Sequence, residues 1–239
     1  MAGPPIAELG VKVVGPERVI VVFDHKVPAD NASNAELHRL WREFCKHHGI
    51  EHLHDVGNQG ISHVISVERG YARPGTLQAN IVPTPTPAAL LAALPRRWEW
   101  ISSRIWYSAG TGIAYRRACV SICRRLSEVS GTRIDQAFLG SCAGGHLSDL
   151  RAAASVLRGR KVHRDVRMVV SPATQEIWTQ AQQEGLRTLF THAGGLVTAA
   201  TCGACFGGMG ALAKGEVCVS NSTENFPGRM GNLQSQAGK

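Results

Sequence analysis

Three cysteines are the residues of this sequence whose type and spacing point most directly to chemistry. Cys202 and Cys205 form a Cys-x-x-Cys pair in the glycine-rich stretch 201–208, and Cys142 lies sixty residues earlier. Small residues around paired cysteines let backbone amides approach sulfur closely, which favours iron–sulfur ligation. Three thiolates would leave one metal position open, and an open iron acts as a Lewis acid toward a hydroxyl or carboxylate. The pattern therefore favours a lyase over an electron carrier.

A zinc site is the main chemical alternative for the same cysteines. Zinc accepts three thiolates and an imidazole, and His146 lies four residues after Cys142. The other cysteines suggest no ligand set. We expect Cys45 and Cys218 to pack in the core, and for Cys119 and Cys123 packing or a chance spacing is favoured over a ligand role.

The bulk composition is that of an ordinary globular protein. The chain has 239 residues, of which 44% are hydrophobic and 18% charged, enough for one sizeable core or two modest ones. Seven cysteines at wide spacing do not form a disulfide framework. No apolar run is long enough for a membrane span and the first ten residues lack a signal-peptide pattern, so a cytoplasmic location is expected.

The formal net charge of +8 is compatible with two kinds of partner. One is nucleic acid, but the basic residues are scattered and aromatic residues do not interleave with them as stacking platforms would. The other is a polycarboxylate substrate held in a basic cleft. The second partner is favoured, and nucleic acid is not expected.

Hydrophobic patterning in the first part of the chain predicts a buried strand over 18–23 that delivers Asp24 and His25 at its carboxyl end. Binding groups belong at such strand ends. Ser33 and Glu36 have the spacing of a capping box, which predicts a helix that runs to Gly49. A short strand is expected over 52–56.

The same alternation recurs in the last part of the chain. Strands are predicted over 137–139, 167–171 and 195–198, and helices over 147–157 and 174–184. Strands alternating with helices imply an α/β sheet with helices on both faces.

The composition divides the chain into three parts: an N-terminal α/β part over 1–77, a connecting segment over 78–133, and a C-terminal α/β part over 134–239 that carries the cysteines. The connecting segment has prolines at 83, 85, 87 and 95 and three of the five tryptophans. Such a stretch is typical of a linker or lid.

Several sequence blocks, in order, resemble the large subunit of the aconitase and isopropylmalate isomerase family. They are 23–28, 60–63 with 70–75, Gly140-Ser141-Cys142, 147–151, 171–176, the turn 202–205, and Asn225 to Gly231. The resemblance covers about residues 8–77 and 134–232. It implies a three-layer α/β/α fold of the aconitase type, shortened in the middle.

The resemblance also implies a function and a site. It implies a 4Fe-4S cluster on Cys142, Cys202 and Cys205 and reversible dehydration of a 2-hydroxy polycarboxylic acid, most closely as in 3-isopropylmalate dehydratase of leucine biosynthesis. Asp24, His25 and His63 would serve the proton and hydroxyl side of the reaction. Arg229 and Ser141 would bind substrate. A separate small subunit carrying the swivelling domain is the implied partner, and homoaconitase or aconitase is a further possibility within the family.

Two departures from the family pattern favour an alternative. An Asp-Ser-His block is expected soon after Gly75-Thr76-Leu77, where this chain has 78–83, and Glu224 stands where the family has an arginine. These losses favour a catalytically incomplete remnant or a non-enzymatic interaction protein. A deletion or a shifted reading frame would explain the segment 78–133. An RNA-binding member of the family is a weaker alternative that only the net charge favours.

Overall fold

The structure of the chain, a computed structural model, describes residues 12–72, 131–222 and 225–237. The chain divides into two compact units, the first formed by 1–71 with 133–239 and the second by 72–132. The connecting segment up to residue 130, Cys119, Cys123 and Glu224 lie outside the described residues.

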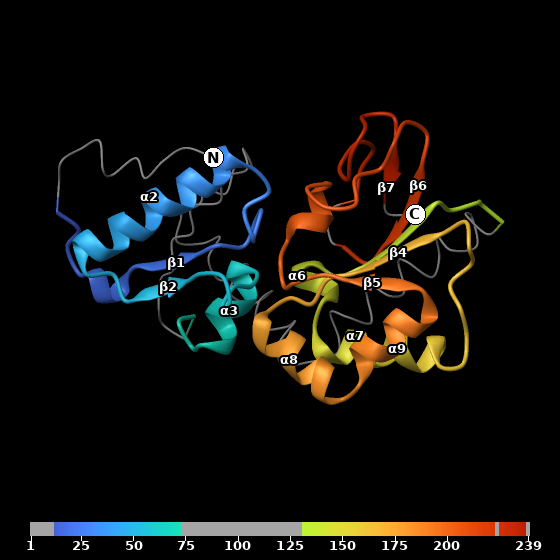
Figure 1. Cartoon of the computed structure of the whole chain (residues 1–239), viewed down its shortest axis with the longest axis horizontal. Helices are drawn as coiled ribbons and strands as arrows, with labels where there is room; N and C mark the ends of the chain where they lie inside the picture. Colours follow the sequence, from blue (N-terminus) through green and yellow to red (C-terminus); the bar gives the residue numbers. More distant parts are fainter. Residues whose placement is uncertain (1–11, 73–130, 223–224, 238–239) are drawn as a thin grey trace, which may run out of the picture. The chain divides into compact units, whose positions relative to one another are not determined.

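A five-stranded parallel sheet forms the centre of the C-terminal part (Figure 1). Its strands are β3 (Gln136–Leu139), β4 (Arg167–Val170), β5 (Gly195–Val197), β6 (Val217–Ser220) and β7 (Gln236–Ala237), in the order β5-β4-β3-β6-β7. The predicted α/β class with parallel strands is confirmed, and three of these strands match the predicted ranges closely. The sequence did not predict β6 or β7; β7 has only two residues, too few to show a hydrophobic period.

Three helices pack on one another beside this sheet: α7 (Leu147–Leu157), α8 (Gln175–Gln183) and α9 (Leu186–Ala193) (Figure 1). Thr174 caps α8, since its hydroxyl accepts a hydrogen bond from the Ile177 amide at 3.2 Å. Gly185, in the left-handed conformation with φ 73°, ends that helix and lets the chain enter α9 at once. The sequence predicted α8 but not α9, because the glycine was interpreted only as a stop.

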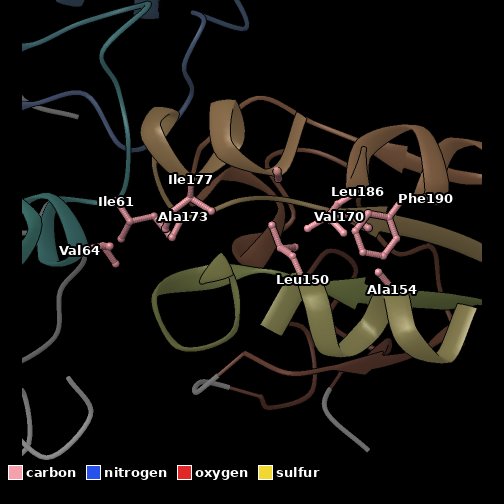
Figure 2. Packing of buried hydrophobic residues seen from close by; sticks show 10 residues of the cluster. Ile61, Val64, Leu150, Ala154, Val170, Ala173, Ile177, Leu186 and Phe190 are labelled. Atoms are coloured by element: carbon pink, nitrogen blue, oxygen red, sulfur yellow. The ribbon is translucent and has the colours of Figure 1, made fainter. Parts of the chain in front are cut away.

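Alternate residues along the central strands enter two different cores. Leu139 and Val170 contribute to a first cluster with Leu150 of α7 and Phe190 of α9, and Figure 2 shows these helices closing over Val170. Phe138 and Val169 belong to a second cluster, which is completed by other buried residues: Ala204, Cys205, Leu212, Cys218, Met230 and Ala237. In the described residues, loops rather than helices cover this second core.

The N-terminal part contains a parallel pair of strands, β1 (Ile20–Val22) and β2 (His52–His54), with helices α2 (Ala32–His48) and α3 (Ser62–Glu68) and a 3-10 turn, η1 (Pro16–Arg18). Helix α2 ends at Gly49, as predicted. The predicted capping box is wrong: Asn31 caps α2 by accepting a hydrogen bond from the Asn34 amide at 2.9 Å. Ser33 therefore lies inside the first turn.

Two of the remaining cysteines lie in the described cores. Cys45 and Cys218 are buried in core clusters, which confirms that they serve packing. None of the described helices is both long and apolar enough to cross a membrane.

Candidate functional site

The Cys-x-x-Cys pair lies on a 3-10 turn, η3 (Gly203–Phe206), which follows β5. The Cys205 amide donates to the Cys202 carbonyl at 3.2 Å, and the two sulfur atoms are 2.7 Å apart. Gly207 ends the turn at φ 79°, where a Cβ atom would lie 2.6 Å from the Met230 carbonyl carbon. Only glycine fits there, so the backbone that presents both thiols depends on this residue.

Cys142 is presented by a second tight turn, α6 (Ser141–Gly144), directly after β3. Asn221, which follows β6, holds this turn at both ends. Its side-chain oxygen accepts from the Gly140 amide at 2.9 Å, and its nitrogen donates to the Gly144 carbonyl at 3.0 Å. The turn is thereby fixed to the carboxyl ends of two adjacent strands, which is where parallel sheets bind ligands.

Cys142 and the Cys202–Cys205 pair follow the carboxyl ends of β3 and β5. None of the three forms a disulfide with another described cysteine, and Cys142 and Cys202 pack against the same hydrophobic cluster. The hydrogen bond with Cys205 and burial raise the pKa of Cys202, with a further contribution from the charge of Cys142. The bond from Cys202, together with the charges of Arg229 and His25, lowers the pKa of Cys205 to about 7. A thiolate is thus favoured at Cys205.

The described residues contain no set of three His, Cys, Asp or Glu side chains arranged to hold a metal ion. The donor chemistry still fits a cluster, because the sulfur atoms of Cys202 and Cys205 are in contact and Cys142 lies near enough to Cys202 for its charge to raise the pKa of that thiol.

His146 does not join the thiols as a zinc ligand would. Its Nε2 atom lies 3.1 Å from the carbonyl oxygen of Cys142, and the His146 amide donates to Asp149 at the start of α7. Because a carbonyl oxygen only accepts, Nε2 carries the proton and its lone pair is not available to a metal. The side chain stabilises the turn that carries Cys142, and this geometry disfavours the zinc alternative.

Asp24 and His25 follow β1 and form a hydrogen-bonded pair, with His25 Nδ1 2.5 Å from Asp24 Oδ1. Burial raises the pKa of Asp24, but the hydrogen bond and charge of His25 and hydrogen bonds from Ser62 outweigh it, so the pKa is lowered. Burial lowers the pKa of His25, but the hydrogen bond to Asp24 and the negative charge of Asp24 outweigh burial. The pKa of His25 is therefore raised. The pair therefore favours a carboxylate beside a protonated imidazole.

Two hydrogen bonds tie the Asp24 backbone to the cysteine turn. The Asp24 carbonyl accepts from the Thr201 hydroxyl and from the Cys202 amide, both at 2.9 Å. The Thr201 hydroxyl also accepts a hydrogen bond from the Gly203 amide at 3.0 Å. The Thr201 backbone carbonyl accepts one from the Ser171 hydroxyl at 2.9 Å. Thr201 is completely buried. It joins two predicted site blocks that are 177 residues apart.

The predicted histidine block docks beside the loop that follows β4. The Ile61 amide donates to the Ala173 carbonyl at 2.8 Å, and Figure 2 shows Ile61 and Val64 beside Ala173. At the start of α3, the backbone and side chain of Ser62 hydrogen-bond to Asp24. His63 itself is exposed and lies outside this hydrogen-bonded group. The structure thus brings Ser62, rather than His63, into contact with Asp24.

The predicted substrate-binding residues lie on two turns. Arg229 hydrogen-bonds to Cys205, and its charge also acts on His25, so its guanidinium lies at the thiols. It stands 5.7 Å from the centre of the Phe226 ring. Ser141 is buried in the left-handed conformation, with φ 74°, and its hydroxyl accepts from the Ala143 amide at 3.3 Å.

Sequence reasoning missed three residues that build the site: Asn221, Thr201 and Ser62. Each acts by hydrogen bonding to backbone or to Asp24, and such contacts join segments far apart in the chain. Thr201 and Ser62 gave a weak signal, because each immediately precedes a predicted site residue. Asn221 gave none.

Comparison with known proteins identifies a family and several relatives of the chain. The model of the aconitase family (aconitate hydratase) matches residues 114–237, just over half of the chain. The match begins inside the segment that composition set apart as 78–133.

Three relatives illustrate the range of similarity. The "3-isopropylmalate dehydratase large subunit 1" of Methanopyrus kandleri is 27% identical over 350 positions, which cover 97% of this chain and 84% of the relative. The "3-isopropylmalate dehydratase large subunit" of Sulfurihydrogenibium sp. is 52% identical over 123 residues, or 50% of this chain and 28% of the relative. The "Methanogen homoaconitase large subunit" of Methanocaldococcus jannaschii is 48% identical over 111 residues, or 46% and 26%.

These lengths describe how the chain differs from its relatives. The alignment with the Methanopyrus kandleri protein has 350 positions, whereas this chain has 239 residues, so parts of the relative have no counterpart here. The two stronger local matches span only 28% and 26% of the relatives' lengths.

Proposed function

Since the chain belongs to the aconitase family, we propose that it acts as the cluster-bearing large subunit of a hydro-lyase. Its reaction would remove and re-add water on a 2-hydroxy polycarboxylic acid, most closely as in 3-isopropylmalate dehydratase, which converts 2-isopropylmalate to 3-isopropylmalate in leucine biosynthesis. One observation carries the proposal: the backbone of Asp24, whose side chain pairs with His25, is hydrogen-bonded directly to the turn that presents two of the three thiols.

Cys142, Cys202 and Cys205 would hold a 4Fe-4S cluster with one iron left without a protein ligand. When bound, the cluster would supply a Lewis acid for the hydroxyl and an adjacent carboxylate of the substrate. Two residues hold the turns that carry these cysteines. Asn221 fixes the turn of Cys142, and Gly207 permits the turn of the other two thiols.

The Asp24–His25 pair would handle the proton that leaves with the hydroxyl group. Asp24 accepts from Nδ1, which fixes the imidazole ring and leaves Nε2 as the atom that faces away from the carboxylate. The hydrogen bond to Asp24 raises the pKa of His25, which favours the protonated ring. Nε2 can therefore donate a proton to a departing hydroxyl, and the carboxylate stabilises the imidazolium before that transfer.

Arg229 would bind a substrate carboxylate, because its planar guanidinium offers paired donors and lies at the thiols. The buried Oδ1 atom of Asn225 accepts no hydrogen bond from a described residue, which leaves an acceptor in the same turn for a substrate hydroxyl. Ser141 would contribute through its backbone turn beside Cys142. His63, which is exposed, would reach the substrate only from the rim of the site.

A small subunit is the proposed partner, because the relatives named above are large subunits. The proposed location is the cytoplasm, where these biosynthetic substrates would be available. In this arrangement the small subunit would close the exposed side of the site, on which His63 lies.

The direct test is an activity assay of the reconstituted chain with an added small subunit of a 3-isopropylmalate dehydratase, with 2-isopropylmalate as substrate. Asp24→Asn should lower kcat by about 10²–10⁴-fold, the usual contribution of a general acid–base group. Asp30→Asn is the matched control, since Asp30 is an exposed aspartate on the same segment. Equal activity of wild type and Asp24→Asn would contradict the proposed role of the pair.

A catalytically incomplete remnant is the second candidate, and the length difference from the relatives favours it. It predicts that the chain folds and gains a cluster but forms no product with any small subunit. Product from homocitrate-type substrates alone would instead favour the homoaconitase alternative, for which the Methanocaldococcus jannaschii relative is the precedent.

A further inference from the structure

A groove distant in sequence from the cysteines lies between the C-terminal end of α7 and the length of α9. It is open to solvent and encloses about 500 Å³, within the range of small-molecule sites. Its floor is apolar, formed by Leu157, Leu189 and Ala193. Its polar lining consists of Arg160, Lys161, Thr188 and His192, and among the described residues that line it none is acidic.

The groove lies at the opposite end of the sheet from the proposed active site. Helix α7 starts just after the carboxyl end of β3 and ends before β4 begins, and α9 ends just before β5 begins. Both helix ends therefore lie at the amino ends of the parallel strands (Figure 1). The thiols and Asp24 follow the carboxyl ends. The groove does not belong to the active site.

Basic residues are concentrated beside the groove. Four of the seven positions from 158 to 164 are arginine or lysine, which departs from the scattered distribution inferred from the whole sequence. Arg164 pairs with Asp165 at 3.8 Å. Arg158, Arg160 and Lys161 make no ion pair with any described residue, so their charge is not neutralised locally.

The simplest structural role for these cations is to stabilise the negative ends of the two helices. The hydrogen bonds at these helix ends show that most of the cations do not serve this role. Backbone amides already cap the last carbonyls: Val162 donates to Ala193 at 2.7 Å, and Gly194 donates to Thr191 at 3.0 Å. Only Lys161 caps with its side chain, by donating one of its three N–H groups to the His192 carbonyl. The remaining N–H groups of Lys161 and the whole Arg160 guanidinium stay available.

We propose that this groove binds a small organic anion that carries at least two negative charges and a short apolar portion. Arg160 and Lys161 would hold the anionic oxygens, Thr188 would donate a hydrogen bond, and Leu157 and Leu189 would contact the apolar portion. Phosphate esters and polycarboxylates share this chemistry. Single-stranded nucleic acid fits less well, because none of the described residues that line the groove is aromatic and could stack on a base.

Binding is tested on the full chain by isothermal titration with inorganic pyrophosphate and with succinate at low and at moderate salt. The two probes distinguish the phosphate source from the dicarboxylate source. We expect saturable binding of at least one probe, and Arg160→Gln/Lys161→Gln should weaken it at least tenfold. The matched control is Arg18→Gln/Lys214→Gln, which removes the same charge from exposed sites elsewhere and should change the Kd less than twofold.

Leu189→Asn gives a second test, because it alters the floor while leaving every charge in place. A probe with an apolar branch, isopropylsuccinate, should then lose affinity more than pyrophosphate does. No saturable binding of any probe, or equal weakening by both double variants, would overturn the proposal. Tight binding of an RNA oligomer with none of these small anions would also overturn it. A variant at Cys202 should leave the affinity unchanged, which separates this site from the proposed active site.

Discussion

The two faces of the five-stranded sheet are covered in different ways, and the difference separates stability from function. Helices α7, α8 and α9 close one face over large side chains such as Phe190 and Leu150. Loops close the other face in the described residues, and there small residues pack closely: Gly207 and Gly231 each leave no room for a Cβ atom. The cysteine turn lies on this second face. A covering of loops can place backbone amides and thiols beside a ligand, which a helix with its bonded backbone does less readily.

The largest expected effect is on the helical face. Phe190→Ala removes a side chain that is only 1% exposed at the centre of the first core, and should lower the free energy of unfolding by about 3–5 kcal/mol. Met230→Ala on the loop face should cost about 2–5 kcal/mol. Urea unfolding measures both. Among the molecules that remain folded, Met230→Ala should impair cluster assembly more than Phe190→Ala does. The reverse result would contradict the difference between the two faces.

Gly207→Ala should be nearly as harmful, for a reason specific to the loop face. The added Cβ would meet the Met230 backbone at 2.6 Å while the residue stays at a positive φ, and overpacking and the left-handed conformation together cost about 2–5 kcal/mol. Gly159→Ala is the matched control: its φ is also positive, at 72°, but no atom lies within 4 Å. It should cost only about 1–2 kcal/mol. Equal losses would show that the close packing has no role.

The sequence predicted the helical face better than the loop face for a physical reason. Leu147, Leu150, Ala154 and Leu157 repeat at helical spacing, so the helix they form can be inferred from neighbours in the chain. The site depends instead on single bonds between distant segments, as when Asn221 holds the turn of Cys142. No local pattern encodes such a bond. The Cys202–Cys205 pair stands out in the sequence because its spacing is local, whereas the hydrogen bonds that hold its turn are not.

The tether between Asp24 and the cysteine turn gives a smaller and more local prediction. Thr201→Val removes the donor to the Asp24 carbonyl and leaves the buried Gly203 amide without its acceptor, which should cost about 1–3 kcal/mol. Hydrogen exchange at residues 24–27 should accelerate. Thr198→Val is the control, since this threonine is also buried but bonds to the Val170 and Ala199 carbonyls. Faster exchange in both variants would argue against a specific tether.

The smallest effect concerns the ion pair of Arg167 and Glu216, which lies at the amino ends of β4 and β6, away from the site. The hydrogen bond with Arg167 lowers the pKa of Glu216 to about 2. A carboxyl whose folded pKa is depressed stabilises the fold above its ordinary value of 4.5, and this contribution is lost as the pH falls toward 2. Glu216→Gln should therefore be less stable than wild type at pH 7 by less than about 1 kcal/mol, because the pair is near the surface. The difference should vanish near pH 2, and a constant difference down to that pH would contradict the assignment.

The central claim is that Cys142, Cys202 and Cys205 hold an iron–sulfur cluster, and anaerobic reconstitution with iron and sulfide tests it most directly. The wild-type chain should show broad visible absorbance and bind about four iron atoms. Cys142→Ser and Cys202→Ser should each lose most of both. Cys218→Ala is the control, because that buried cysteine belongs to the same core but not to the ligand set, and it should keep the spectrum. A colourless wild-type protein, or a spectrum unchanged in Cys202→Ser, would contradict the account.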